Sequence, residues 1–339
     1  MKNMRNWQSK MDINSHELLV ITACFQAGNL AKGEKMTHNA SPTSLLYKYV
    51  TISVLKKVLE GSIRFTQPSA FNDPLELLPE IIVPNDEKER TISVSFDIRA
   101  QRQSRSVEQN DAIPDGYGSS DAMSRGIVRQ LNQIIGILSL SKTRDSLLMW
   151  AHYADQYSGA VITFDGTHDF FSDQIDIEYQ SERPRRHLRD YLTGTPIPLA
   201  ELCVKSDQWA YEKEVRIVRT LAECKHAGID LRGFPIFVHE VPIDAIKSVI
   251  LGERTPVVEQ REIFARVMDS KISLSLAAID HSRFAFRDEI IKLALPISQV
   301  GPMMSPRTAH IFSELQTKRG EFARRLINKG NPPALPGRQ

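Results

Sequence analysis

Alternating apolar and polar positions along the chain predict many short strands, which helical periods interrupt at irregular intervals. Residues 45–49 (LLYKY) predict a first strand, and a helix capped by Ser53 and ended by Gly61 separates it from a second strand at 63–66. Further strands are predicted at 136–141, 160–164, 175–179, 236–241, 248–251, 272–279 and 284–295. Helices are predicted at 127–135, 143–158 and 257–268. Because strands and helices do not alternate regularly, we expect an α+β fold with a mixed or antiparallel sheet and flanking helices.

The remaining segments predict a core with two appendages. Residues 1–44 form an accessory arm with one helix, and residues 45–295 form the core. Within the core, 84–126 is polar and charged and contains glycine, which is typical of an insertion or a mobile loop. Residues 296–339 contain an amphipathic helix near 308–327 and end in a proline-rich tail that we expect to be disordered.

Composition excludes a few classes of protein. The 339 residues are 41 % hydrophobic and 25 % charged, which predicts a globular protein with a buried core. A net charge of +2 gives no strong electrostatic field, so the overall charge does not by itself predict nucleic-acid binding. The three cysteines fit neither a disulfide framework nor a zinc site, and no apolar run is long enough to span a bilayer. We therefore expect a cytoplasmic protein without a membrane segment.

The segment 208–219 (QWAYEKEVRIVR) is the most informative stretch of the sequence. Glu212 and Glu214 stand two residues apart where an extended segment begins, and the period of a strand would send both carboxylates to one face. Arg216 and Arg219 alternate with apolar residues and are predicted to face solvent. Two adjacent like charges need cations, protons or substrate donors, so this segment is either a salt-bridged surface or a site.

Four other segments carry candidate site residues, and each also has a purely structural interpretation. The SAFNDP turn at 69–74 offers polar groups and a ring, but its side chains can simply bond their own backbone. The aromatic residues at 150–153 can bind a flat ligand or pack a core, and the histidine among them can be a base or a packing residue. The candidates are Lys48 and Tyr49; Ser69, Phe71, Asn72 and Asp73; Ser139 and Ser141; Trp150, His152 and Tyr153.

Familiar catalytic and nucleotide-binding motifs are missing from the chain. The sequence contains no GxGxxG, no Walker loop, no HExxH and no GxSxG. This removes the commonest dinucleotide-binding, nucleotide-hydrolysing, zinc-protease and serine-hydrolase classes. No metal site is predicted.

Five separated blocks resemble a bacterial family known as domain of unknown function 2971. In order, they are LYKY, a helix ending in glycine, SAFNDP, LMWAHYAD and WAYEKEVR, and a late strand DAIKSVILG at 244–252 is also similar. The resemblance covers about 45–286, so the two appendages lie outside it. The family implies no chemistry by itself.

A second resemblance implies chemistry. ADP-ribosyltransferases of the arginine-serine-glutamate class carry a basic residue on their first strand, then Ser-x-Ser, then Glu-x-Glu. Lys48, the pair Ser139 and Ser141, and the pair Glu212 and Glu214 follow that order, with lysine where the class has arginine. The resemblance implies an ADP-ribosyltransferase-like fold that uses NAD as substrate. It assigns Glu214 as the catalytic carboxylate and Glu212 as the group that orients the acceptor, while the other candidates hold NAD.

These expectations lead to one main hypothesis and two alternatives. The main hypothesis is an ADP-ribosyltransferase that modifies RNA, DNA or protein as a toxin or antiviral defence effector, with a possible antitoxin or chaperone partner. It expects Lys48, Ser139 and Glu214 to converge on one cleft, which the SAFNDP turn and the aromatic helix also line. The first alternative is a non-enzymatic binding module of a bacterial defence or toxin-antitoxin system. The second is a metal-dependent nuclease built from Asp73, Asp145 and Glu214.

Overall fold

The computed structural model divides into two compact units, each assembled from separate stretches of chain. It describes residues 44–82, 119–187 and 198–330. The first unit comprises the described residues within 67–135 and 178–207. The second comprises the described residues within 39–66, 136–177 and 208–339. Residues 1–43 of the predicted arm, residues 84–118 of the predicted insertion and the tail after residue 330 lie outside the described residues.

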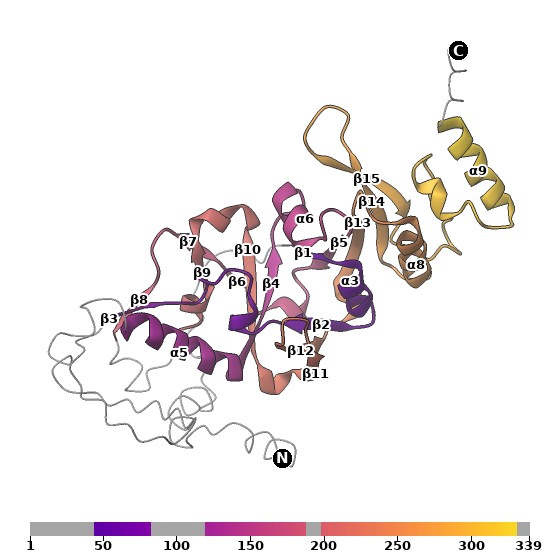
Figure 1. The fold of residues 1–339 in the computed structure, drawn as a ribbon. Coiled ribbons are helices and arrows are strands. Elements are labelled where there is room, and N and C mark those ends of the chain that lie inside the picture. Colours follow the sequence, from indigo (N-terminus) through magenta and orange to yellow (C-terminus); the bar gives the residue numbers. More distant parts are fainter. Residues whose placement is uncertain (1–43, 83–118, 188–197, 331–339) are drawn as a thin grey trace, which may run out of the picture. The chain divides into compact units, whose positions relative to one another are not determined.

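An eight-stranded sheet forms the centre of the second unit. Its strands are β1 (Leu45–Val50), β4 (Ile135–Ser141), β5 (Ala160–Asp165), β6 (Ile175–Asp176), β10 (Glu214–Thr220), β13 (Ile246–Leu251), β14 (Ser273–Ile279) and β15 (Phe286–Lys292). Their order is β15-β14-β13-β5-β1-β4-β10-β6 (Figure 1). β13 and β14 run parallel, whereas β5 is antiparallel to both of its neighbours. The sheet is mixed, which confirms the α+β prediction.

A smaller sheet in the same unit has the order β11-β12-β2 and is antiparallel. It consists of β11 (Lys225–Ile229), β12 (Pro235–Glu240) and β2 (Ser62–Phe65). The sequence pattern predicted the second and third of these strands. It did not predict β11, because KHAGI is mostly exposed and has no apolar alternation.

The helices of the second unit are α3 (Ile52–Leu59), α6 (Leu147–Tyr153), α8 (Val257–Val267) and α9 (Lys318–Gly330). α3 begins two residues earlier than predicted, because Thr51, not Ser53, supplies the cap: the Thr51 hydroxyl accepts a hydrogen bond from the Val54 amide at 3.3 Å. Gly61 follows the helix with φ +85°, a left-handed conformation that favours glycine, as predicted.

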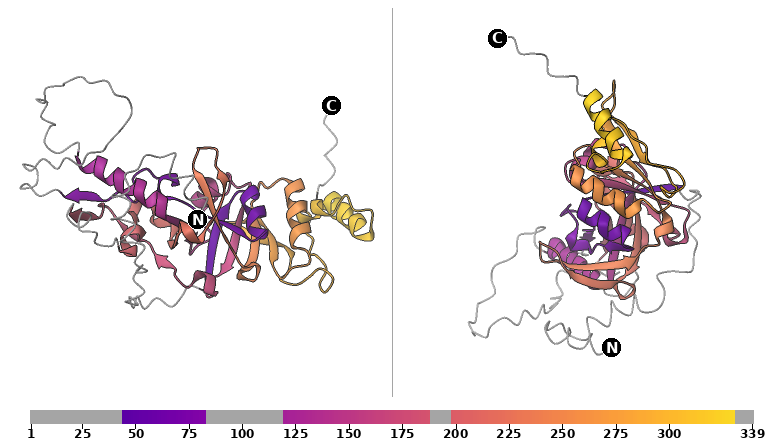
Figure 2. Two further views of the ribbon diagram at one scale, coloured as in Figure 1. Left: turned by 90° about the horizontal axis from the view of Figure 1, so that it is seen from below. Right: turned by 90° about the vertical axis from the view of Figure 1, so that its right-hand side faces the viewer.

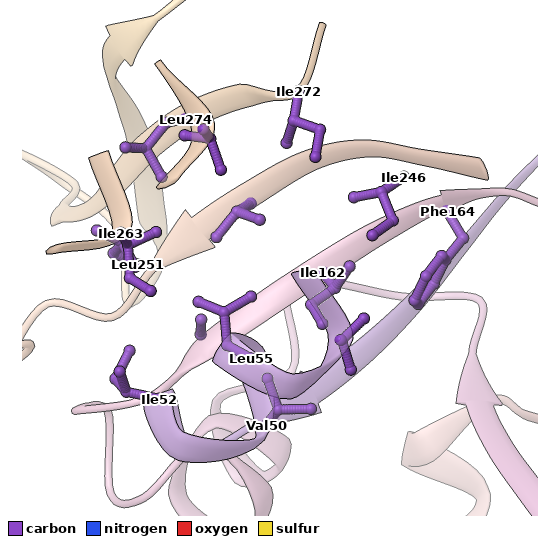
Figure 3. Close-up of a cluster of buried hydrophobic side chains, with 14 of the residues drawn as sticks. Val50, Ile52, Leu55, Ile162, Phe164, Ile246, Leu251, Ile263, Ile272 and Leu274 are labelled. Atoms are coloured by element: carbon purple, nitrogen blue, oxygen red, sulfur yellow. The ribbon is translucent and has the colours of Figure 1, made fainter. Parts of the chain in front are cut away.

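Two hydrophobic clusters cover opposite faces of the large sheet. Along β1, Leu46 and Val50 belong to the larger cluster and Tyr49 to the smaller one, as strand alternation requires. The larger cluster is mainly aliphatic and packs α3 and α8 against the sheet; Figure 3 shows it around Leu55 and Ile162. Full burial of each such side chain stabilises the fold by about 1.5 to 3 kcal/mol.

The first unit is smaller and consists mostly of short strands and turns. Its helix α5 (Ser119–Ile134) contacts the 3₁₀ turn η1 (Pro68–Ala70) and the strand β3 (Glu80–Ile82). β3 pairs in parallel with β8 (Arg185–His187), and β7 (Glu178–Gln180) pairs in parallel with β9 (Val204–Ser206). Residues 119–126, predicted as part of the insertion, are therefore helical. The buried Ser124 hydroxyl in this helix donates a hydrogen bond to the Pro79 carbonyl.

None of the helices in the described stretches is long and apolar enough to cross a membrane.

Candidate functional site

The two glutamates at 212 and 214 do not lie on one continuous strand. Glu212 is the last residue of the 3₁₀ helix η4 (Asp207–Glu212), Lys213 has φ +45°, and Glu214 begins β10. The left-handed residue between them separates a 3₁₀ helix from a strand, so the prediction of two carboxylates on one strand face is wrong. Each glutamate instead has its own set of partners.

Glu214 forms a buried ion pair with Arg216, its neighbour on the same face of β10. Arg216 Nε lies 2.8 Å from one carboxylate oxygen of Glu214, and Arg216 Nη2 lies 3.3 Å from the other. Arg216 is fully buried, so the prediction that it faces solvent is wrong: the carboxylate compensates the guanidinium inside the protein. Burial lowers the pKa of Arg216 to about 9, which leaves it charged at neutral pH.

Glu212 is held by two separate elements. The Tyr153 hydroxyl on α6 donates a hydrogen bond to the Glu212 carboxylate at 2.6 Å. The Ser141 hydroxyl at the end of β4 donates to the Glu212 backbone carbonyl, also at 2.6 Å, and the Lys142 amide donates to the Lys213 carbonyl at 3.0 Å. Because Glu212 is only 3 % exposed, these bonds fix a carboxylate that bulk water barely reaches.

Lys48 lies on β1, the strand next to β4. Its ammonium donates to the Ser139 backbone carbonyl at 2.9 Å. Burial lowers the pKa of Lys48 to about 8, while the nearby Glu214 carboxylate raises it and Arg64 lowers it further. The register of β1 on β5 pairs Lys48 with Ile162, so its side chain leaves the sheet on the face of the larger cluster. The strands β1, β4 and β10, which carry Lys48, Ser139 and Glu214, are neighbours in the sheet. Because Leu138, Leu140, Val215 and Ile217 belong to the larger cluster, Ser139 and Glu214 project from the other face, so the three side chains do not share one face of the sheet.

The two serines of β4 differ in what their hydroxyls do. The Ser141 hydroxyl bonds backbone groups of Glu212 and Thr143. The Ser139 hydroxyl is buried and has no hydrogen-bond partner among the described residues. An orphaned buried hydroxyl costs free energy, about 1 to 3 kcal/mol, unless another group satisfies it.

The aromatic helix α6 contributes one side chain to the glutamate cluster. Trp150 is 2 % exposed, donates its indole N–H to the Arg144 carbonyl at 3.2 Å, and packs edge-on against Tyr49 with ring centroids 5.6 Å apart. The Tyr49 hydroxyl donates to the Thr143 carbonyl at 3.1 Å, and burial raises its pKa. These two rings pack the smaller cluster, whereas Tyr153 contacts Glu212; His152 is exposed.

A strained turn follows α6, which is shorter than predicted. Residues 155–157 have φ values of 48°, 50° and 73°, and each left-handed residue costs about 1 to 2 kcal/mol. Close backbone contacts hold the turn: a Cβ at Gly159 would lie 2.2 Å from the Val50 carbonyl oxygen, and one at Gly252 would lie 2.0 Å from that of Tyr157. Strain that the surroundings enforce in this way concentrates at functional sites.

Residues 149–217 match the family described as protein of unknown function (DUF2971). The chain is similar to this family across that stretch. The matched residues, called here the DUF2971 segment, include most of α6, the left-handed turn and the pair Glu214 and Arg216. No curated protein and no solved structure matches the chain. The buried ion pair and the tyrosine–glutamate bond are therefore features of the segment for which a family resemblance is supported.

The SAFNDP turn lies outside the DUF2971 segment and belongs to the first unit. Ser69 bonds the Asn132 side chain through both its amide, at 2.8 Å, and its hydroxyl. The Asp73 carboxylate accepts from the Leu75 amide at 2.9 Å, and the Phe71 amide donates to the Pro68 carbonyl at 3.3 Å. These bonds make a well-formed turn. That Asn72 and its neighbours line a cleft with α6 stays a prediction.

Within the described residues, no group of three or more histidine, cysteine, aspartate or glutamate side chains could hold a metal ion.

Two features of the site were missed by the sequence interpretation. One is Arg216 as the partner of Glu214, which the i, i+2 spacing of opposite charges on a strand could have indicated. The other is the left-handed Lys213, for which the residue type gives no signal, because lysine is uncommon at positive φ.

Proposed function

We propose that the second unit is an ADP-ribosyltransferase-like domain that cleaves NAD and transfers ADP-ribose to a macromolecular acceptor. The observation that supports this best is that β1, β4 and β10 are neighbours in one sheet. They carry Lys48, Ser139 and Glu214, the three positions that the resemblance to the arginine-serine-glutamate class singles out. Three short motifs that are common in sequences gain weight when their strands are adjacent, and the Glu214 charge is near enough to raise the pKa of Lys48.

Glu214 would act on the charge that develops at the ribose. In this reaction the bond between ribose C1′ and the nicotinamide nitrogen breaks, and its electrons leave with nicotinamide. The remaining oxocarbenium-like state is stabilised by a fixed negative charge. Because Arg216 stays protonated at neutral pH, it supports the ionised form of Glu214 and holds its orientation through two hydrogen bonds.

Glu212 would orient the acceptor. Its carboxylate has a second oxygen besides the one that Tyr153 bonds, and that oxygen can accept from the attacking nucleophile. As the nucleophile forms its bond to C1′, its proton passes to this carboxylate or to solvent. Tyr153 and Ser141 then act as positioning residues, which hold Glu212 without touching the reacting atoms.

The Lys48 ammonium and the Ser139 hydroxyl would hold NAD. With a pKa of about 8, Lys48 is mostly protonated at pH 7 and can attract a pyrophosphate. The buried Ser139 hydroxyl is a donor that a bound ligand could satisfy. As in other proteins with this chemistry, the acceptor would be an intracellular protein or nucleic acid, and the role that of a toxin or antiviral defence effector.

The test compares two glutamine variants with a matched control. Glu214→Gln should reduce NAD cleavage about a hundredfold or more, because it removes the charge and keeps the shape. Glu212→Gln should impair transfer to an acceptor more than it slows NAD hydrolysis. The control is Glu76→Gln in the first unit, where a buried carboxylate lies 3.7 Å from Lys205 but no motif is present. It should lower the melting temperature and leave NAD cleavage intact.

A non-enzymatic binding module is the second candidate, and the buried pair of Glu214 and Arg216 favours it, because such a pair can serve packing alone. In that case the wild type would neither bind nor consume NAD, and Glu214→Gln would change only the melting temperature.

A further inference from the structure

One face of the C-terminal helix α9 carries basic residues around an exposed aromatic ring. Lys318, Phe322, Arg325 and Lys329 follow one another at steps of four, three and four residues, which places them on one side of a helix. The three basic residues are exposed, and the Phe322 side chain is 53 % exposed. This set is called the basic face. The Phe322 ring lies between these cations and is accessible to a partner.

The other side of α9 is anchored to the second unit. Ala323 is fully buried in the larger cluster, and Leu326 and Ile327 pack against that cluster. Gly320 sits so close to the chain before it that a Cβ would lie 1.9 Å from the Leu315 carbonyl oxygen. Figures 1 and 2 show α9 at the yellow end of the chain, and α9 contacts the 3₁₀ helix η7 (Thr308–Ile311) that precedes it. The helix is therefore held in a fixed orientation with its basic face outward.

The charges of the basic face are not neutralised by the described part of the protein. None of the three cations Lys318, Arg325 and Lys329 forms an ion pair with a described residue. The carboxylate of Glu314 forms its ion pair with Arg261, at 2.5 Å. α9 has five basic residues and one acidic residue, so its charge stands out in a chain of net charge +2.

The arginines of β8 behave differently. Arg185 lies 2.7 Å from Glu80, and Arg186 is buried against Glu201. Both cations are therefore paired inside the first unit, whereas α9 keeps its positive charge available to a partner.

We propose that the basic face of α9 binds single-stranded nucleic acid. Three exposed cations spaced along one face can follow successive phosphates, and an exposed ring between them can stack on a base. A purely electrostatic partner, such as an acidic protein surface, would make no use of Phe322. The proposal rests on α9 alone and does not depend on whether the second unit cleaves NAD.

The experiment measures fluorescence anisotropy of a labelled single-stranded oligothymidylate of about 20 nucleotides, mixed with the full chain across a range of salt concentrations. The wild type should bind with a log–log salt slope of about −2, since each neutralised phosphate contributes about −0.7. The variant Lys318→Gln/Arg325→Gln/Lys329→Gln should bind about tenfold more weakly or worse and lose most of that slope. Phe322→Ala should weaken single-strand binding at least about fivefold and keep the slope.

The matched control removes the same charge elsewhere on the second unit. Lys57→Gln/Lys225→Gln/Lys271→Gln replaces three exposed lysines outside α9 and should bind like the wild type. Circular dichroism and thermal melting of each variant establish that the fold is kept.

Three results would overturn the proposal. The first is a wild type that does not bind, or an α9 triple variant that binds no worse than the control. The second is equal competition by polyaspartate of matched charge, which would point to an acidic protein. The third is duplex binding as tight as single-strand binding together with no effect of Phe322→Ala, which would remove the role of base stacking.

Discussion

The two faces of the eight-stranded sheet carry different kinds of side chain. On one face, aliphatic residues such as Leu46, Val50 and Leu55 pack α3 and α8 into a core with few polar groups. The other face carries Trp150 and several tyrosines, and Glu214 and Arg216 project from β10 on that face. Burying aliphatic groups stabilises the fold, whereas burying charges costs free energy unless each has a partner. The second face therefore carries a buried ion pair, whereas the partly buried cation of the first face, Lys48, donates to a backbone carbonyl.

Backbone strain follows the same division. The three left-handed residues at 155–157 end α6, which packs on the aromatic face, and Lys213 separates the two glutamates of that face. Strain and buried charge together mark this side of the sheet as the candidate for a function, because packing alone would be served better without them.

The largest stability effect is expected from breaking the buried ion pair. Arg216→Met should destabilise the protein by about 3 to 5 kcal/mol, because it leaves the Glu214 carboxylate buried without its cation. Adding Glu214→Gln should restore much of this loss, since the uncompensated charge is gone. Chemical denaturation of the two single variants and the double variant gives the coupling. Strictly additive losses would show that the two side chains are not a pair in solution.

A core substitution on the other face sharpens the comparison. Leu55→Ala removes a fully buried side chain between α3 and the sheet and should cost about 2 to 5 kcal/mol. Unlike Arg216→Met, it should have no second-site partner that rescues it by a change of charge. Rescue of Leu55→Ala by Glu214→Gln in the same denaturation assay would mean that the two faces are not independent.

The pH dependence of the free energy of unfolding should reveal the lowered pKa of the Lys48 ammonium. Its pKa in the folded protein is about 8, below the ordinary value of 10.5, so between these two pH values the unfolded chain binds more protons than the folded one. The Lys48 contribution to stability therefore rises with pH across this window, by about 1 to 3 kcal/mol. Stability of the wild type minus that of Lys48→Met, measured by denaturation from pH 7.5 to pH 10, should increase accordingly. A flat difference would contradict the buried environment of Lys48.

The smallest effect is expected at Tyr153. Tyr153→Phe deletes the hydroxyl that bonds Glu212 and should cost about 1 kcal/mol or slightly more. In the proposed enzyme it should also reduce transfer to an acceptor more than NAD hydrolysis, as Glu212→Gln does. Equal reduction of both activities would argue that Tyr153 does not act through Glu212.

Periodicity predicted most of the large sheet. LLYKY at 45–49 and AVITF at 160–164 are strands rich in apolar residues, and AVITF is a nearly continuous apolar run because the core buries it on both faces. β8 was missed because its two arginines are satisfied by glutamates far away in sequence, so its polar pattern resembled a loop. The start of α5 was missed for a similar reason, since its first residues are polar.

The sequence could name candidate residues but not the partners that hold them. Lys48, Ser139 and Glu214 could be proposed because polar residues within apolar strands need partners. What their partners are depends on tertiary packing: Arg216 joins Glu214, and Tyr153 joins Glu212 across 59 positions of sequence. No local pattern encodes such long-range bonds.

The most direct test of the account is the release of nicotinamide from NAD by the purified full chain, followed by chromatography, with candidate protein and nucleic-acid acceptors present. We expect the wild type to release many equivalents per protein molecule and Glu214→Gln to release at least about a hundredfold less, with its circular dichroism spectrum unchanged. Release by the wild type that does not exceed that of Glu214→Gln would contradict the assignment of Glu214 and the transferase proposal with it.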